Sequence, residues 1–255
     1  MKITRAALAV VMIAPLVGAS ALASASEFDS VKAKLQAAMQ SDVRSDQEKG
    51  RDQNRLPIET LEFFGLRDDM RVIELMPGGG WYTKLLAPVL SDNGDFYIAI
   101  GAERVAGSLA DEPGFEKLKL TAADSSLNRG SQGYDLTLPS LGVADADMVF
   151  TFRNYHNFSE AGRMQMNEKV FEALKPGGIY AVVDHTRRHM EPASDDNGRR
   201  VDPVLAIMEI QSTGFEFVGY TDLHYRTADE LLYEVGRPNV TGKTDRWTLK
   251  FRKPE

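Results

Sequence analysis

The sequence predicts one α/β domain built on a mostly parallel sheet with helices on both faces. Short apolar strands alternate with helices through the middle of the chain, and such alternation is typical of parallel sheets with right-handed helical crossovers. Two late strands are joined by a loop instead of a full helix, which predicts an antiparallel edge. The chain has 255 residues, long for one domain and short for two, so one large domain with an appendage is expected.

Composition excludes several other classes of protein. Hydrophobic residues make up 43% of the chain and charged residues 26%, which excludes wholesale disorder, collagen and a multi-spanning membrane protein. There is no cysteine, so disulfides, thiolate metal sites and a cysteine nucleophile are excluded. The formal net charge is −7 and no dense basic run offsets it, so nucleic acid is not an expected partner. Nothing in the sequence indicates an oligomeric state.

The first 25 residues have the three-part layout of a secretory signal peptide. Lys2 and Arg5 precede an apolar run, and small residues follow as far as Ala25. Cleavage is expected after Ala25 or, as the alternative, after Ala23, and no stable membrane insertion would then remain. An uncleaved membrane anchor is disfavoured because Pro15 interrupts a short apolar core. The mature protein would be periplasmic or secreted, with a net charge of −9 once two basic residues are lost.

A helical arm, residues 26–56, is expected to precede the main domain, residues 57–255. Apolar residues recur at helical spacing across 27–47, which predicts an amphipathic helix. The connector over 50–56 is rich in Arg and Asp. Such a segment is usually solvated surface, and the alternative is that it lies over a ligand cleft. A second helix over 58–64, introduced by proline and stopped by glycine, opens the main domain.

The predicted strands are short apolar runs bounded by turn-forming residues. In chain order they cover Arg71–Met76, Asp95–Ile100, Lys117–Ala122, Met148–Phe152, Ile179–Asp184, Phe215–Thr221 and Arg246–Arg252. The helices expected between them cover Tyr82–Leu90, Val105–Leu109, Glu160–Leu174 and Asp202–Thr213. Because open α/β sheets bind ligands beyond the carboxyl ends of their strands, the loops that follow the strands are the candidate site.

The loop after the first strand has three consecutive glycines. Gly78, Gly79 and Gly80 stand between strand and helix, where the backbone can closely approach a ligand. Glu74, at the strand end, can accept hydrogen bonds from an amine or from sugar hydroxyls. The alternative is a tight strand-to-helix turn without a ligand.

The loop after the fourth strand concentrates polar side chains. Arg153, Asn154, Tyr155, His156 and Asn157 bring a guanidinium, two carboxamides, a phenol and an imidazole together where this fold places chemistry. His156 is one of four histidines and can act as a general base near neutral pH, although a lone histidine is more often structural.

Asp184 and His185 emerge at the end of the fifth strand, beside the fourth loop if these strands are neighbours. A metal site made from Asp184, His185 and His189 is disfavoured because Arg187 and Arg188 would oppose a cation. No metal is therefore expected.

These residues resemble class I S-adenosylmethionine (SAM)-dependent methyltransferases over about residues 55–253. The likeness lies in the acid-plus-glycine loop, the polar fourth loop, the Leu-Lys-Pro-Gly-Gly turn at 174–178 and the closing strand pair. Residues 74–83, 152–157 and 244–254 look like a subgroup of exported bacterial methyltransferase-like proteins, with motifs ELxPGGGWYT and FRNxHN. The resemblance implies a Rossmann-like, seven-stranded, mostly parallel sheet with an antiparallel C-terminal edge strand, and SAM bound over the glycine loop.

The resemblance also assigns candidate residues. Those for the cofactor are Glu74, Met76, Pro77, Gly78, Gly79, Gly80, Tyr82, Glu103, Asp124, Arg153 and Asn154, and those for catalysis are Tyr155, His156, Asn157 and His185. Glu74 would contact the methionyl amine, and Asp124, with Asp135 as the alternative, would serve the adenine side.

Two positions depart from the family pattern. Met76 stands where the pattern has its first glycine, and Gly101 stands where the second strand usually ends in an acid that holds the ribose. Glu103 is the nearest substitute for that acid.

Three functions follow as hypotheses. The first is methyl transfer from SAM to a small molecule or exported acceptor, for which a positioned nucleophile and one base suffice, Tyr155 or His156 aided by Asn157. The alternative is an exported binding or accessory protein that keeps the fold but has lost or exchanged its cofactor. The third is another chemistry in the same crevice that uses His156 and His185 with Asp184.

Overall fold

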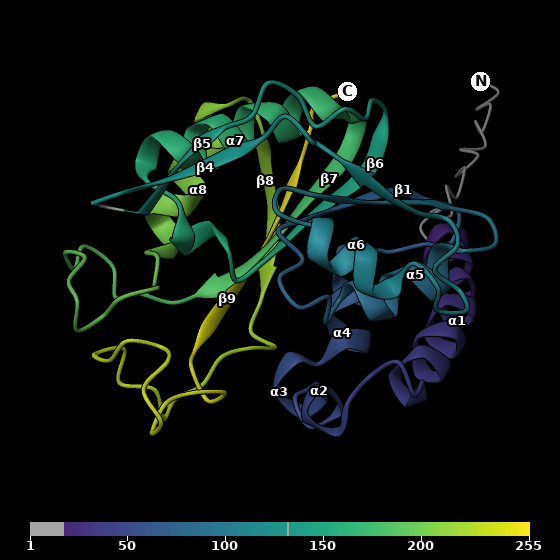
Figure 1. Ribbon diagram of the computed structural model, residues 1–255, viewed down its shortest axis with the longest axis horizontal. Helices are drawn as coiled ribbons and strands as arrows, with labels where there is room; N and C mark the ends of the chain where they lie inside the picture. Colours follow the sequence, from purple (N-terminus) through teal and green to yellow (C-terminus); the bar gives the residue numbers. More distant parts are fainter. Residues whose placement is uncertain (1–17, 132) are drawn as a thin grey trace, which may run out of the picture.

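The computed structural model describes residues 18–131 and 133–255, with side chains from residue 28 onward (Figure 1). Most of the expected signal peptide, residues 1–17, lies outside the described residues. Its remainder belongs to the start of helix α1, Gly18–Gln40. In the described part of the chain, no helix combines the length and the apolar character needed to cross a membrane.

Seven strands form the central sheet, in the order β3-β2-β1-β6-β7-β9-β8. Their bounds are Arg71–Leu75 for β1, Asp95–Ala99 for β2, Leu118–Thr121 for β3, Ala146–Phe152 for β6, Leu174–His185 for β7, Glu216–Thr221 for β8 and Arg246–Arg252 for β9. Strands β1, β2, β3, β6 and β7 pair in parallel, and β9 pairs antiparallel with both β7 and β8. The predicted mostly parallel sheet with an antiparallel C-terminal strand is confirmed.

Helices cover both faces of this sheet, as predicted (Figure 1). The remaining helices are α2 Asp46–Lys49, α3 Asp52–Arg55, α4 Pro57–Phe64, α5 Thr83–Leu90, α6 Glu103–Leu109, α7 Glu160–Ala173 and α8 Pro203–Ser212, with a 3₁₀ turn, η1, at Tyr155–Asn157. One apolar core joins α1, α4, α5 and α6 to one face, and a second joins α7 and α8 to the other. Neighbouring strand residues alternate between the cores, because side chains alternate along a strand.

The predicted helix over 27–47 is wrong in its C-terminal part. Helix α1 ends at Gln40, and a separate helix α2 begins after Ser45. The Ser45 hydroxyl accepts from the backbone N–H of Glu48, and the Glu48 carboxylate accepts from the backbone N–H of Ser45. This capping box starts a new helix where apolar spacing alone predicted that the first one continues.

A second, two-stranded sheet was not expected from the sequence. Strands β4, Ser126–Gly130, and β5, Gly133–Thr137, form an antiparallel hairpin, and β5 packs on α7. The alternating polar residues of β4 leave only a weak apolar pattern. The chain therefore makes a detour between β3 and β6 over the outer side of α7 (Figure 1).

Candidate functional site

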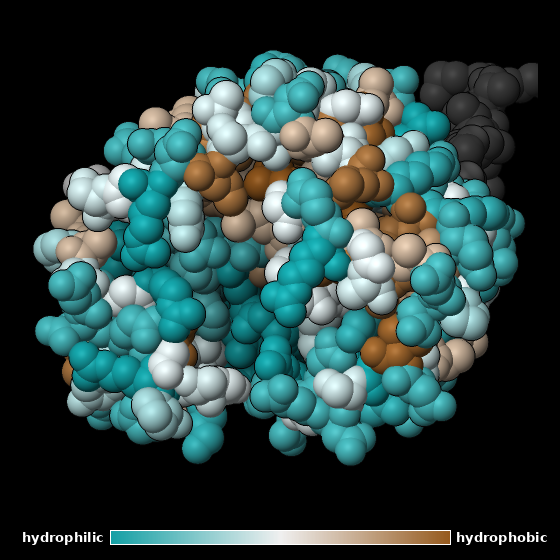
Figure 2. Space-filling model, in the orientation of Figure 1, coloured by the Kyte–Doolittle hydropathy of each residue, from teal (hydrophilic) through white to brown (hydrophobic). Residues whose placement is uncertain are grey.

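Two pockets open where the parallel strands end. The glycine-loop pocket, about 590 Å³, lies between the loop after β1, the start of the loop after β6 and residues 42–55 of the arm. The histidine pocket, about 330 Å³, lies between the loop after β6, the end of β7 and the link over 235–244. Arg153 and Asn154 line both pockets. Figure 2 shows a hydrophilic hollow on this face, between the region of α2 and α3 and the C-terminal link.

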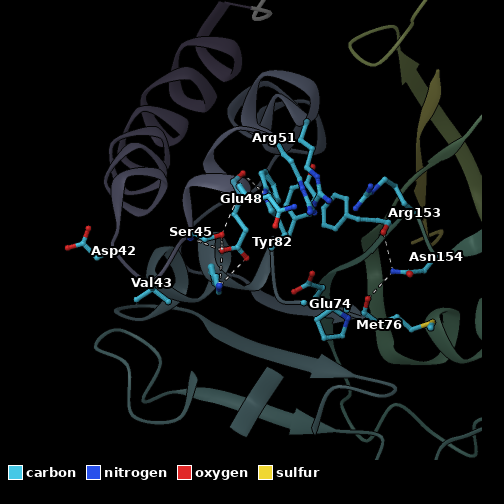
Figure 3. A pocket seen from close by; sticks show the side chains of 18 residues that line it. Asp42, Val43, Ser45, Glu48, Arg51, Glu74, Met76, Tyr82, Arg153 and Asn154 are labelled. Carbon is cyan, nitrogen blue, oxygen red and sulfur yellow. Dashed lines mark hydrogen bonds and ion pairs between the residues drawn. The ribbon is translucent and has the colours of Figure 1, made fainter. Parts of the chain in front are cut away.

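The loop after β1 is pinned to the neighbouring strands. The Met76 backbone N–H donates to the Ala99 carbonyl at 2.8 Å, and the Asn154 side chain donates to the Met76 carbonyl at 2.9 Å (Figure 3). Met76 has φ 49°, in the left-handed region that favours glycine, and this is the position where the family pattern has glycine. The backbone thus keeps the glycine conformation although the side chain differs.

The three glycines divide into two roles. Beside Gly78 and Gly79, no atom of the described residues lies within 4 Å of where a Cβ would stand, so their backbone faces open space in the pocket. A Cβ on Gly80 would stand 2.9 Å from Val105 Cγ1. Gly80 therefore permits close packing against α6 and does not line the pocket.

Glu74 is a buried acid at the inner end of the glycine-loop pocket. Its Oε2 accepts a 2.6 Å hydrogen bond from the Thr83 hydroxyl. Burial raises the pKa of Glu74 to about 7, although the Thr83 hydrogen bond and the charge of Arg55 lower it. Near neutral pH the carboxyl group therefore occupies both protonation states.

The arm forms the outer wall of this pocket. Lys84 Nζ lies 3.0 Å from both carboxylate oxygens of Glu48, and Trp81 Nε1 donates to the Glu48 carbonyl at 2.9 Å. Figure 3 shows Ser45, Glu48 and Arg51 on the arm, facing across the pocket toward Glu74, Met76 and Arg153. Of the two interpretations of the polar connector, the structure favours the one in which it lies over a cleft, because Arg51 and Arg55 line this pocket.

His156 and Asp184 form a buried pair at the histidine pocket. His156 Nδ1 lies 2.6 Å from Asp184 Oδ1, and the His156 backbone N–H donates to Asp184 Oδ2 at 2.8 Å. Because the carboxylate accepts at Nδ1, the imidazole carries its proton there and Nε2 is left as the basic nitrogen. Nε2 makes no hydrogen bond within residues 18–131 and 133–255.

The other two catalytic candidates of this region also line the histidine pocket. His185 Nδ1 lies 2.9 Å from the Thr244 hydroxyl, and burial first, then the charge of Arg246, holds the pKa of His185 well below its usual value. His185 is therefore neutral at physiological pH. Asn157 donates to the Asn154 side chain at 3.3 Å.

Tyr155 does not reach either pocket. It is fully buried, donates to Glu209 Oε2 at 2.8 Å and accepts from Asn167 Nδ2 at 3.0 Å. Burial also raises the pKa of Tyr155 well above its usual value. The position does not support the expected catalytic role, because η1 turns this side chain into the core beneath α7 and α8.

The candidates for the ribose and adenine sides lie away from the glycine-loop pocket. Glu103 and Asp124 are exposed and line neither pocket, and Asp135 accepts from the Ser159 hydroxyl at 2.5 Å. Gly101, in the left-handed region with φ 65°, has no atom within 4 Å of a Cβ position. The structure therefore brings together the predicted residues of the first and fourth loops and leaves out those after β2 and β3.

Two arginines that the sequence did not single out complete the site. Arg55 from α3 and Arg246 from β9 converge with Arg153 around a narrow cavity between the two pockets. Burial first, and then the charge of Arg153, lower the pKa of Arg55 to about 9 and that of Arg246 to about 10. Each of these arginines is about a hundred residues from the next along the chain, so no local sequence pattern could have linked them.

The residues considered for a metal site are engaged elsewhere. Asp184 holds His156, and His189 Nδ1 lies 2.9 Å from Asp202 Oδ2. Across the described ranges, no group of three His, Asp or Glu side chains is arranged to hold a metal ion.

The sheet order, with an antiparallel β9 between β7 and β8 and a pocket beyond β1 and β6, defines the class I SAM-dependent methyltransferase fold. A SAM-dependent methyltransferase from Aquifex aeolicus is similar, with 15% identity, a TM-score of 0.55, and 87% of this chain and 97% of that one covered. So is the [4+2]-cyclase SpnF, with 16% identity, a TM-score of 0.56, and coverage of 89% and 93%.

Human N-acetylserotonin methyltransferase in complex with SAM also resembles the chain, with 16% identity, a TM-score of 0.52, and coverage of 89% of this chain and 58% of that one. The sequence matches no family model and no curated protein. At these identities the likeness shows a shared fold, which confirms the predicted fold class. The exported subgroup named above stays a prediction.

Proposed function

We propose that the protein transfers a methyl group from SAM to a small molecule held in the histidine pocket. The observation that carries the proposal is His156, which is paired with buried Asp184 and lines a pocket that shares Arg153 and Asn154 with the glycine-loop pocket. A base thus lies next to the place where this fold binds its cofactor. The SAM-dependent methyltransferase and the SAM complex among the similar structures support the same assignment.

The glycine-loop pocket fits SAM in its size and in its loop. Its volume of about 590 Å³ is within the range of small-molecule sites. The open space at Gly78 and Gly79 allows the backbone to approach a ligand, and Glu74 and Asn154 supply polar contacts beside it. These four residues are the ones that would hold the cofactor.

When bound, SAM supplies an electrophilic methyl group, and breaking the sulfur–methyl bond leaves its electron pair on a neutral thioether. His156 Nε2 would accept the proton of the attacking hydroxyl or amine as the new bond to the methyl carbon forms. Asp184 fixes the ring orientation and stabilises the imidazolium that results. Neutral, buried His185 adds no competing positive charge.

Calorimetric titration with SAM and S-adenosylhomocysteine tests the proposal. We expect both ligands to bind the purified protein, and we expect His156→Ala to keep that binding, since His156 does not line the glycine-loop pocket. Failure of both ligands to bind at millimolar concentration would overturn the proposed function. It would favour an accessory protein of this fold, as would a chemically unrelated ligand found by native mass spectrometry.

A further inference from the structure

The three arginines around the narrow cavity form a cationic cluster, here called the arginine seam, of buried Arg55 and Arg246 and half-buried Arg153. Arg55 is 4% exposed and Arg246 is 6% exposed. Within the described ranges, the Nε atom of each member has no hydrogen-bond partner, and the side-chain hydrogen bond of the seam is from Arg246 to the Asn54 carbonyl at 2.8 Å. Arg55 also stacks over Trp81, with its Cζ 4.3 Å from the ring centroid, and no carboxylate of the described residues pairs with any of the three. Unpaired buried charges are costly unless a partner arrives.

Elsewhere the chain pairs its buried arginines with carboxylates. Arg44 lies 2.5 Å from Asp52, and Arg200 lies 2.9 Å from Asp229. The arginines of the seam therefore differ from Arg44 and Arg200 in having no carboxylate partner within the described ranges. A buried polar group without a partner calls for an explanation, and a functional role is one.

The nearest acids do not neutralise the seam. Asp184 is committed to His156 and to the backbone N–H groups of His156 and His185. Glu74 is the acid that faces Arg55, and near pH 7 it carries only part of a charge. Positive charge thus remains in excess between the two pockets.

The lining of the histidine pocket indicates which class of ligand these positive charges would bind. Among the residues that the structure describes, no Asp or Glu lines that pocket, although the whole chain is acidic, whereas the glycine-loop pocket is lined by Asp42, Glu48 and Glu74. Arg153 and Arg246 line the histidine pocket together with hydroxyl and amide groups and with His156. A wall of donors without a carboxylate is complementary to an oxyanion.

We propose that the molecule bound in the histidine pocket carries a carboxylate or phosphate group, which Arg153 and Arg246 bind beside His156. Guanidinium groups can hold either oxyanion through two parallel hydrogen bonds. Arg199 also lines this pocket, but its guanidinium pairs with Glu234, so Arg153 and Arg246 are the arginines left to bind the anion. The anion site stands on this lining alone, whereas its role in binding a methyl acceptor rests on the proposed function.

Titration with inorganic phosphate and with citrate, at ionic strength held constant with sodium chloride, tests the anion site. We expect at least one of the two to bind the purified protein, and we expect Arg246→Gln and Arg153→Gln each to weaken that binding at least tenfold. Arg246→Lys keeps a charge at the same buried position and covers the case in which Arg246→Gln does not fold. It should bind with intermediate affinity, because an ammonium group lacks the planar fork.

Arg129→Gln is the matched control, because Arg129 is an exposed arginine of the β4–β5 hairpin and lines neither pocket. It should bind as the unaltered protein does. Stronger binding of phosphate than of citrate would assign a phosphorylated ligand, and the reverse order a carboxylic acid. Binding of neither anion, or equal binding by the unaltered protein and the folded Arg246 and Arg153 variants, would overturn the proposal.

Titration of the same variants with SAM separates this proposal from the proposed function. Arg246 does not line the glycine-loop pocket, so Arg246→Lys should change the affinity for SAM less than threefold. Arginine-dependent anion binding without SAM binding would leave the anion site standing and remove the methyltransferase. SAM binding without anion binding would leave the proposed methyl transfer standing and remove the anion site.

Discussion

Asp184 shows how one buried residue organises the chemistry of the histidine pocket. Its two carboxylate oxygens accept from the His156 ring and from the backbone N–H groups of His156 and His185. It therefore fixes the ring and the loop that carries it at the same time. Removing its charge should affect the base more than it affects the pocket's shape.

Asp184→Asn tests this assignment. The amide cannot hold the proton on Nδ1 as the carboxylate does, so the rate of methyl transfer should fall about 10²- to 10⁴-fold. SAM affinity should stay within about threefold, a change of about 0.7 kcal/mol. Single-turnover kinetics and calorimetry measure the two effects, and an unchanged rate in a folded Asp184→Asn protein would contradict the assignment of His156 as the base.

Glu74 predicts a dependence of stability on pH. Its pKa is about 7 in the folded protein and near 4.5 when solvated, so the folded state binds the proton more tightly. The contribution of this carboxyl group is fully present below pH 4.5 and is lost as the pH rises toward 7. The loss amounts to on the order of 3 kcal/mol in the free energy of unfolding.

Urea unfolding at pH 5 and pH 8 measures the effect. The difference in unfolding free energy between the two pH values should be smaller in Glu74→Gln than in the unaltered protein, because glutamine does not titrate. Glu112→Gln, at a position outside both pockets, serves as the control. The same pH difference in Glu74→Gln would show that another group titrates instead.

At the scale of elements, four of the five parallel strands share an unusual ending. The residue directly after each of β1, β2, β3 and β6 has positive φ; these residues are Met76, Ile100, Ala122 and Arg153. A non-glycine residue in this region costs on the order of 1 to 2 kcal/mol. Strain of this kind gathers at functional sites, and here it follows the edge of the sheet where the two pockets open.

Met76→Gly tests what the unusual side chain does there. Glycine suits φ 49° and removes a side chain that lines the glycine-loop pocket. We expect SAM to bind about three- to tenfold more tightly, which corresponds to roughly 1 kcal/mol. Calorimetry measures the affinity, and weaker binding by Met76→Gly would mean that the methionine side chain is a positive determinant of the ligand.

Some elements of the site followed from local sequence and others did not. The polar loop after β6 placed Arg153, Asn154, His156 and Asn157 at the pockets because the carboxyl ends of parallel strands share one edge. Tyr155 departs from this because the 3₁₀ turn directs neighbouring side chains to opposite sides. Spacing alone does not show which side chain of such a turn is buried.

The strand order was predictable in kind, since alternating strands and helices imply a parallel sheet, but the β4–β5 hairpin was not. Its strands are short and one of them is mostly polar. The arginine seam was also out of reach, because it depends on packing between the arm, the fourth loop and the last strand.

For the whole molecule, the expected export remains a proposal that protein chemistry can test. The first 25 residues carry two basic residues and no acidic one, and the structure describes them only from residue 18. We propose that cleavage after Ala25 yields a mature protein that begins at Ser26. Intact-mass measurement of protein recovered from the periplasmic fraction or the medium checks this, and a full-length chain confined to the cytosol would contradict it.

The position of the last strand has a consequence for when the site can exist. Strand β9 lies between β7 and β8, so the C-terminal side of the sheet is incomplete until residues 246–252 insert. Arg246 stands at the start of that strand, which means that the seam assembles in the same event that completes the sheet. A chain still emerging from a ribosome therefore lacks the wall of the histidine pocket that Arg246 and the link before it supply, and ligand binding in that pocket reports that the last strand has joined the sheet.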